Sequence, residues 1–319
     1  MNVLPEIYHI LASVHSKQPL VPGALMYNQR WLLRLVLAAE RQGLHCLPFR
    51  FADGARWFSE TMLYTAFGAS SLGDTRAEPC TAAGGVVGHF DFPEGGKLGL
   101  HLSPLASQFV VCEAKLFSPL SGGEPKTRGF DQAARTVACM AYTLKLLGDQ
   151  APEEFDWQNF QSLGFYLLAP VAQIKAGGLK ERLDPGSLRD KIRKRIHGYP
   201  EPQRSELKEW MEDWVIPLLD HPRFEAACVS WEAILKRVQR RDKEYGQDLQ
   251  EFYFFCKKYH RYQSPGACLW ASPEGEQDVI LVKRGEKYSR VRFEDGRETM
   301  VSNETVITLA SPNANGQPP

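Results

Sequence analysis

The chain has few cysteines, and none of them are arranged in close pairs. Seven cysteines stand singly along 319 residues. An odd number of isolated cysteines argues against a disulfide framework and favours free thiols in a reducing compartment. The first residues also lack a basic segment followed by a long apolar run, so neither a signal peptide nor a membrane anchor is expected. These absences predict a soluble, cytoplasmic protein that does not associate with a membrane.

Net charge is also lacking. Lys and Arg total 38, and Asp and Glu total 38, so the formal net charge at pH 7 is zero. A neutral chain has no overall basic field that would attract nucleic acid, and any such binding would have to come from a local patch. What is present is a globular composition, with 43% hydrophobic and 24% charged residues. This composition is that of a globular protein, for which disorder is not the default, and it fits one large domain or two smaller ones.

The pattern of apolar residues predicts an α/β core of the α+β kind in the first half of the chain. Helices are predicted at 26–43, 55–70 and 129–148. Short strands rich in Val, Phe and Leu are predicted at 84–92, 97–102, 108–117 and 162–170. The first three strands would form a meander, and the last would pair beside it. The order helix, three strands, helix, strand therefore predicts a mixed sheet that is covered by helices.

The rest of the chain changes in character twice. Residues 1–175 are assigned to the α/β core with its N-terminal helices, and 176–263 to a mainly helical extension. Residues 264–310 contain four or five short alternating strands, which resemble a small SH3-like or Tudor-like β-barrel. The basic strands of this module fit docking of a protein partner and contact with nucleic acid equally well. The tail 311–319 lacks apolar residues and is predicted to be disordered.

Charged side chains occur on strands that are otherwise apolar. In the segment FVVCEAK, strand alternation places Glu113 and Lys115 together on one face. A neighbouring strand that carries Asp91 would bring a second carboxylate beside Glu113, and two such carboxylates repel each other unless a cation lies between them. Mg²⁺ suits this site, because it prefers oxygen ligands and commonly takes one or two carboxylates with water and phosphate. Lys115 could then activate water or stabilise charge on a phosphate.

Two more side chains are candidates for the same site. Glu60, in the predicted helix 55–70, could supply a third carboxylate to the metal or its water shell, and Gln132 could hydrogen-bond the nucleophile or a phosphate. Basic residues flank the start of the helix that carries Gln132, namely Lys126, Arg128 and Arg135. They fit phosphate binding at a helix start and an exposed charged turn equally well.

The order Glu60, Asp91, Glu113-x-Lys115, Gln132 resembles that of the PD-(D/E)xK nuclease superfamily, whose core has the element order α-β-β-β-α-β. The resemblance covers about residues 50–170. It implies that Asp91 and Glu113 bind Mg²⁺ or Mn²⁺ and that Lys115 assists the attacking water. It also implies that Glu60 and Gln132 complete the site, with Glu60 near the metal.

The resemblance implies a restriction-endonuclease-like core and a metal-dependent endonuclease that hydrolyses DNA, in restriction or antiphage defence. The proline that precedes the first Asp in that family is replaced here by Phe90. Two alternatives stay open at this point. One is a catalytically inactive, nuclease-like scaffold that binds nucleic acid or a protein partner, and the other is a nuclease that processes RNA. The sequence is compatible with any oligomeric state.

Overall fold

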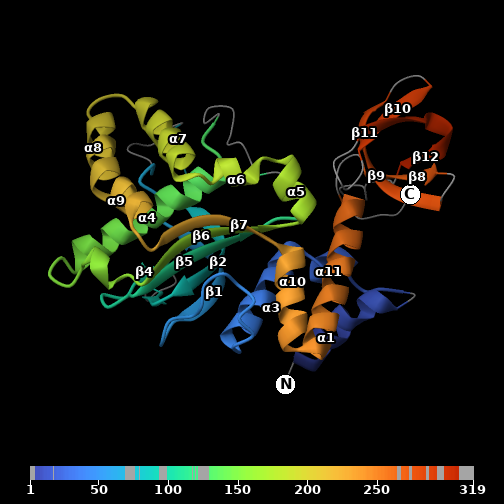
Figure 1. The fold of residues 1–319 in the computed structure, drawn as a ribbon, viewed down its shortest axis with the longest axis horizontal. Coiled ribbons are helices and arrows are strands. Elements are labelled where there is room, and N and C mark those ends of the chain that lie inside the picture. The colour runs from blue at the N-terminus through green and yellow to red at the C-terminus, as the bar shows by residue number, and fades with distance from the viewer. Residues whose placement is uncertain are drawn as a thin grey trace.

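A computed structural model describes residues 4–308, apart from residues 17, 69–75, 79, 93–98, 117, 119, 121–128, 264–266, 273–274, 285–286 and 293–297. Its centre is a five-stranded mixed sheet with helices on both faces (Figure 1). The mixed α/β class predicted from the sequence is therefore confirmed.

The sheet has the strand order β1-β2-β5-β6-β7. Its strands are β1 (Arg56–Leu63), β2 (Thr81–Gly88), β5 (Gln108–Ala114), β6 (Ser162–Ala169) and β7 (Phe224–Ser230). The pairs β1/β2 and β2/β5 are antiparallel, whereas β5/β6 and β6/β7 are parallel. Because β5 is antiparallel to one neighbour and parallel to the other, the pairing in the sheet changes from antiparallel to parallel at this strand.

The central strands are buried on both faces. Every residue of β5 is buried, and so are all residues of β6 except the first. Near-continuous apolar runs are typical of strands that have helices on both sides. Against this background Glu113 is the one carboxylic acid among the buried residues of β5.

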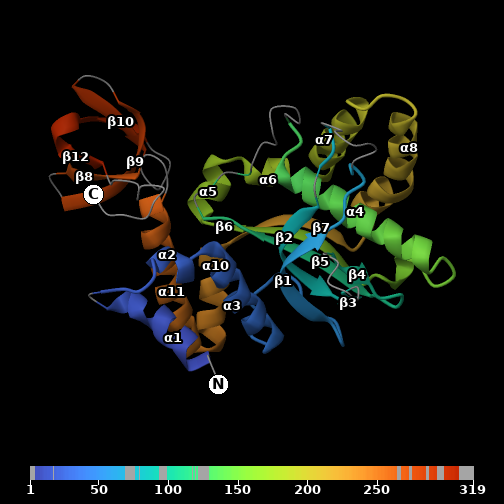
Figure 2. The same ribbon diagram turned by 180° about the vertical axis from the view of Figure 1, so that it is seen from behind.

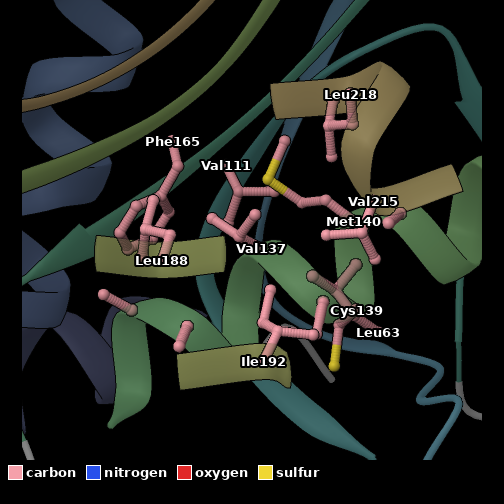
Figure 3. Close-up of a cluster of buried hydrophobic side chains, with 14 of the residues drawn as sticks. Leu63, Val111, Val137, Cys139, Met140, Phe165, Leu188, Ile192, Val215 and Leu218 are labelled. Atoms are coloured by element: carbon pink, nitrogen blue, oxygen red, sulfur yellow. The ribbon is translucent and has the colours of Figure 1, made fainter. Parts of the chain in front are cut away.

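One face of the sheet is covered by α4 (Gln132–Gln150) and by a second layer of helices. That layer consists of α7 (Pro185–His197), α8 (Gln203–Trp210), a π-helical segment (Met211–Val215) and α9 (Ile216–Asp220). The apolar cluster between them includes Val111 and Phe165 from the sheet, Val137 and Met140 from α4, and Ile192 from α7 (Figure 3). Residues 185–220 thus pack directly on the α/β core.

The other face carries α3 (Gln29–Arg41), α10 (Trp231–Arg241) and α11 (Lys243–Gln263). Near the N-terminus, α1 (Leu4–Ala12) and α2 (Gly23–Met26) lie beside α11 (Figures 1 and 2). This second apolar cluster includes Leu33 and Leu37 of α3, Val110 of β5 and Trp231 of α10. The sheet therefore separates two apolar clusters.

The remaining elements are short or belong to the C-terminal module. β3 (Phe90–Asp91) and β4 (His101–Leu102) form a two-stranded sheet, and α5 (Val171–Ala176) and α6 (Leu179–Arg182) follow β6. The C-terminal strands are β8 (Ala267–Ser272), β9 (Gly275–Arg284), β10 (Tyr288–Arg292), β11 (Glu298–Ser302) and β12 (Val306–Thr308). They form an antiparallel sheet in the order β11-β10-β9-β8-β12, which confirms the predicted strands. In the described part of this module no pairing of β11 with β12 closes the sheet into a barrel.

Three predicted elements differ from the structure. In the described part of the predicted strand 97–102, only His101–Leu102 form a strand, β4, and it lies outside the main sheet. The segment 55–70 was predicted to be a helix, but it contains the edge strand β1. Glu60 in this strand has a φ of 60°, which interrupts the regular alternation of side chains and obscures the strand pattern in the sequence. The predicted strand 84–92 is divided, because β2 ends at Gly88, whose φ is 151°, and the chain then enters β3. The meander consequently consists of β1, β2 and β5.

Candidate functional site

The carboxyl group of Glu113 is held near the C-terminal end of β5. Its Oε1 accepts a hydrogen bond from the backbone N–H of Gly84 (3.2 Å), and its Oε2 accepts one from Nε2 of Gln132 (3.1 Å). Gly85 pairs with Cys112 in the antiparallel register, so Gly84 lies beside Glu113 on the neighbouring strand. The side chain of Glu113 is therefore directed toward the start of α4, on the face of the sheet that α4 covers.

The start of α4 is fixed by Asp131. This residue caps the helix, with Oδ1 accepting from the N–H of Ala134 (3.1 Å). Its Oδ2 accepts from Nη2 of Arg182 and from Nζ of Lys191, both at 3.0 Å. Burial alone would raise the pKa of Asp131, but these hydrogen bonds and charges outweigh it and hold the pKa below its usual value. Asp131 thereby positions Gln132, the first residue of the helix.

Lys115 directly follows the end of β5, two residues beyond Glu113. The main chain of Lys115 is held on both sides, because its N–H donates to Leu168 O (2.8 Å) and its carbonyl accepts from Nε1 of Trp231 (2.9 Å). Strand alternation then directs the side chains of residues 113 and 115 to the same face. Gln132 hydrogen-bonds to Glu113, and the charge of Lys115 lowers the pKa of Glu113, so the structure brings these three residues together.

Burial shifts the pKa of both charged groups. The pKa of Glu113 is raised to about 7, because desolvation outweighs the lowering by the charge of Lys115 and by the hydrogen bond from Gly84. Desolvation also lowers the pKa of Lys115, and the charge of Glu113 raises it in part. Glu113 forms no direct ion pair with any described residue. Buried charges in proteins are usually paired or bound to a metal, so a carboxylate of this kind is suited to receive a cation.

Asp91 does not lie near this carboxylate. Gly88 pairs with Phe109 at the opposite end of β5, four residues or about 13 Å from Glu113 along the strand. Asp91 follows Gly88 in β3, where its exposed carboxylate forms an ion pair with Arg56 (2.8 Å). The prediction that Asp91 lies beside Glu113 assumed one continuous strand at 84–92. Because β2 ends at Gly88, that strand is not continuous and the prediction is wrong.

Glu60 is also placed away from Glu113. It forms ion pairs with Arg30 (2.8 Å to Nη1) and Arg34 of α3. Because α3 and α4 cover opposite faces of the sheet, the carboxyl groups of Glu60 and Glu113 lie on different sides of it. Among the described residues there is accordingly no group of three His, Cys, Asp or Glu side chains that could hold a metal. Of the three carboxylates predicted to bind metal, Glu113 is the one that lies beside Lys115 and Gln132.

Of the three residues predicted to bind phosphate, the structure describes one, Arg135. Lys126 and Arg128 lie outside the described residues. Arg135 is half-buried and donates from Nε to Oε2 of Glu78 (3.0 Å). Nε of Arg195 lies 3.2 Å from Oε1 of the same carboxylate. Arg135 therefore belongs to a buried ion-pair network, and it would have to leave Glu78 to contact a phosphate.

Sequence reasoning missed Asp131 and Glu78, which organise the surroundings of the site. Asp131 carries a recognisable signal, because it is a capping residue directly before an Ala-rich helix. Glu78 has no such signal in the sequence, because its ion-pair partners Arg135 and Arg195 lie 57 and 117 residues further along the chain. Long-range ion pairs of this kind follow from the tertiary fold alone.

No family model matches this chain, and no curated protein or solved structure has significant similarity to it. In the part of the chain that the structure describes, no helix is both long enough and apolar enough to cross a bilayer. The candidate site is therefore defined by the arrangement of Glu113, Lys115 and Gln132.

Proposed function

We propose that this protein is a Mg²⁺- or Mn²⁺-dependent phosphodiesterase that cleaves DNA at the site formed by Glu113, Lys115 and Gln132. The observation that carries the proposal is the buried carboxylate of Glu113, which has no ion-pair partner among the described residues. A purely structural residue at this position would more commonly be apolar or directly paired.

The order of the elements supports a restriction-endonuclease-like core. Leaving aside the small β3–β4 sheet, the chain runs α3, β1, β2, β5, α4, β6. This is the α-β-β-β-α-β order that the resemblance to PD-(D/E)xK nucleases implies. Glu113 lies near the end of the third of these strands, Lys115 directly follows that strand, and Gln132 begins the next helix, which supports the resemblance.

Each residue has a definite role in the proposed reaction. Glu113 would hold the cation through one carboxylate, which suffices for Mg²⁺ when water and substrate phosphate provide the other ligands. When bound, the metal would polarise the phosphate and lower the pKa of water. Lys115, with its lowered pKa, would orient or deprotonate the nucleophile, or balance the charge on the phosphate. Gln132 would keep the carboxylate of Glu113 oriented.

Cleavage of plasmid DNA with Mg²⁺ or Mn²⁺ tests the proposal, with matched single substitutions. Glu113→Gln and Lys115→Met are each expected to reduce the rate by about 100-fold or more, the usual contribution of a positioned catalytic group. Asp91→Asn and Glu60→Gln serve as controls, because both carboxylates are paired elsewhere in the fold. They are expected to leave the rate within a factor of about 3, which corresponds to under 1 kcal/mol. Loss of activity in the controls with retention in Glu113→Gln would show that the site is misplaced.

A catalytically inactive, nuclease-like scaffold is the second candidate. It is favoured by the positions of Asp91 and Glu60, because each of these acids is engaged by arginine away from Glu113. Thermal melting with and without divalent metal separates the two functions. Metal-dependent stabilisation together with cleavage supports the enzyme. If the metal neither stabilises the protein nor supports cleavage of DNA or RNA, the proposed metal site is wrong and the scaffold is the better description.

A further inference from the structure

A cavity lies between the N-terminal segment and α11, away from the candidate active site. Its volume is about 250 Å³, and it is lined by His15, Tyr27, Asp248, Glu251, Phe252 and Phe255. The last four of these are spaced i, i+3, i+4 and i+7 on α11, so they share one face of this helix. That face is turned toward the segment that carries His15 and Tyr27, where α1 and α2 lie beside α11 (Figure 2).

Aromatic rings form the wall of this cavity. The ring centroid of Tyr27 lies 4.9 Å from those of Phe252 and Phe255, and the ring of His15 lies 5.3 Å from Phe255. The hydroxyl of Tyr27 is hydrogen-bonded to Nε2 of His15, and Tyr259 stacks on the Tyr27 ring. The rings hold one another in place, so the wall is formed before any ligand binds.

Two carboxylates lie at the same cavity. Asp248 and Glu251 are both exposed, and neither forms an ion pair with another described residue. The negative charge of Glu251 acts electrostatically on Tyr27 in the aromatic wall. It adds to burial and to the effect of Tyr259 in raising the pKa of Tyr27. The phenol therefore remains uncharged at neutral pH, and the negative charge at this cavity comes from the two carboxylates.

We propose that this cavity binds the alkylammonium group of an organic cation. Aromatic faces attract such cations through their quadrupoles, and a nearby carboxylate adds Coulomb attraction. The volume of about 250 Å³ is slightly below the range of roughly 300–1,000 Å³ that is usual for pockets of drug-sized ligands. A small ammonium head group suits this size. The group can belong to a free amine or to the end of a lysine side chain.

Ligand-observed NMR titration of the full chain tests this proposal with charged and neutral probes of equal shape. Choline is expected to bind at least about 5-fold more tightly than 3,3-dimethylbutan-1-ol, its neutral isostere, because only the cation gains the aromatic and carboxylate attraction. A capped tripeptide with a central lysine is compared with its norleucine counterpart in the same way. Binding of choline alone assigns the cavity to small free ammonium compounds, and binding of the lysine peptide assigns it to lysine side chains.

Substitutions locate the binding to this cavity. Glu251→Gln is expected to weaken binding about 2- to 5-fold, the usual range for an exposed ion pair, and Phe255→Leu to weaken it similarly by loss of a ring. Glu244→Gln is the matched control, because it removes the same charge from an exposed residue of α11 that does not line the cavity. Because Glu251 is exposed, its variant is expected to fold normally, which circular dichroism checks. Equal affinity for the charged and neutral probes, or unchanged affinity in Glu251→Gln, would overturn the proposal.

Discussion

At the scale of single residues, Glu113 combines full hydrogen bonding with incomplete charge compensation. Both carboxyl oxygens accept hydrogen bonds, from Gly84 and Gln132, yet no cation is paired with them directly among the described residues. Hydrogen bonds satisfy the polar atoms but compensate only in part for the loss of hydration of a charge. This imbalance is tolerated at functional sites more often than in an ordinary core.

The raised pKa of Glu113 leads to a prediction about stability and pH in the presence of a chelator. Its pKa is raised from 4.5 to about 7, so between these values the folded state binds more protons than the unfolded state. Folding stability from this group is therefore present below about pH 4.5 and is lost as pH rises through about 7. From pH 5 to pH 8 the wild type is expected to lose about 1–3 kcal/mol relative to Glu113→Gln. Denaturant unfolding at the two pH values measures this difference, and a constant difference would contradict it.

Asp131, in contrast to Glu113, is a buried carboxylate whose charge is compensated by Arg182 and Lys191. Replacing it with Ala removes the cap of α4 and leaves Arg182 and Lys191 without their shared acceptor. The expected loss is about 2–4 kcal/mol of unfolding free energy, measured by urea denaturation. Asp190→Ala is the control, because among the described residues this exposed carboxylate pairs only with Arg193 on the same helix. A change of about 0.5 kcal/mol or less is expected there.

At the scale of elements, the end of β2 decides where Asp91 lies. Gly88 has a φ of 151°, and a Cβ at this position would overlap the carbonyl oxygen of Gln108 on β5. A residue with a side chain would therefore have to move the backbone of β5 as well as adopt a strained conformation. The turn from β2 toward β3 depends on glycine at this position.

Gly88→Ala is accordingly expected to destabilise the protein by about 3 kcal/mol or more, from strain and overlap together. Gly43→Ala is the matched control, because Gly43 also has a positive φ of 87° but has nothing within 4 Å of the added Cβ. Strain alone should cost about 1–2 kcal/mol there. Thermal unfolding of the two variants gives the comparison, and equal losses would mean that the overlap at Gly88 is relieved by a small shift.

The elements also show which features can be predicted from the sequence. Long apolar segments with a single pattern were predicted correctly, and they include α3, α4, β5 and β6. The alternation along β5 was sufficient to place Glu113 and Lys115 on one face. Cys112 and Ala114 belong to the apolar cluster on the other face.

The errors arose where a single residue changes the direction of the chain. The positive φ of Glu60 breaks the alternation of β1, and the remaining apolar spacing is compatible with a helix. The break at Gly88 is equally local, but it moves Asp91 to the far end of the sheet. The sequence therefore predicted the long single-pattern elements correctly, but not the edge strand β1 or the position of Asp91.

At the scale of the whole molecule, the segment predicted as a helical extension contributes to both apolar clusters. Ile192 of α7 packs on one face of the sheet, Trp231 of α10 on the other, and β7 completes the sheet. Among the described residues, neither cluster includes a side chain beyond Tyr259. The C-terminal strands form their own sheet instead.

A chain that ends after Gln263 is therefore expected to keep the α/β fold. Its melting temperature, followed by circular dichroism, should lie within about 3 °C of the value for the full chain, which corresponds to about 1 kcal/mol. Any metal-dependent stabilisation should also be retained, because all three proposed site residues precede residue 263. A larger drop in melting temperature would show that the C-terminal module supports the core.

The division of the interior by the sheet has a further consequence for local unfolding. β5 and β6 have a separate apolar cluster on each face, so detachment of one helical layer leaves the other layer still packed on them. Regions with many buried contacts open least often, and the two central strands have them on both sides. The backbone that carries Glu113 and Lys115 is thus expected to be the most slowly exchanging part of the molecule, even when the helices around it fluctuate.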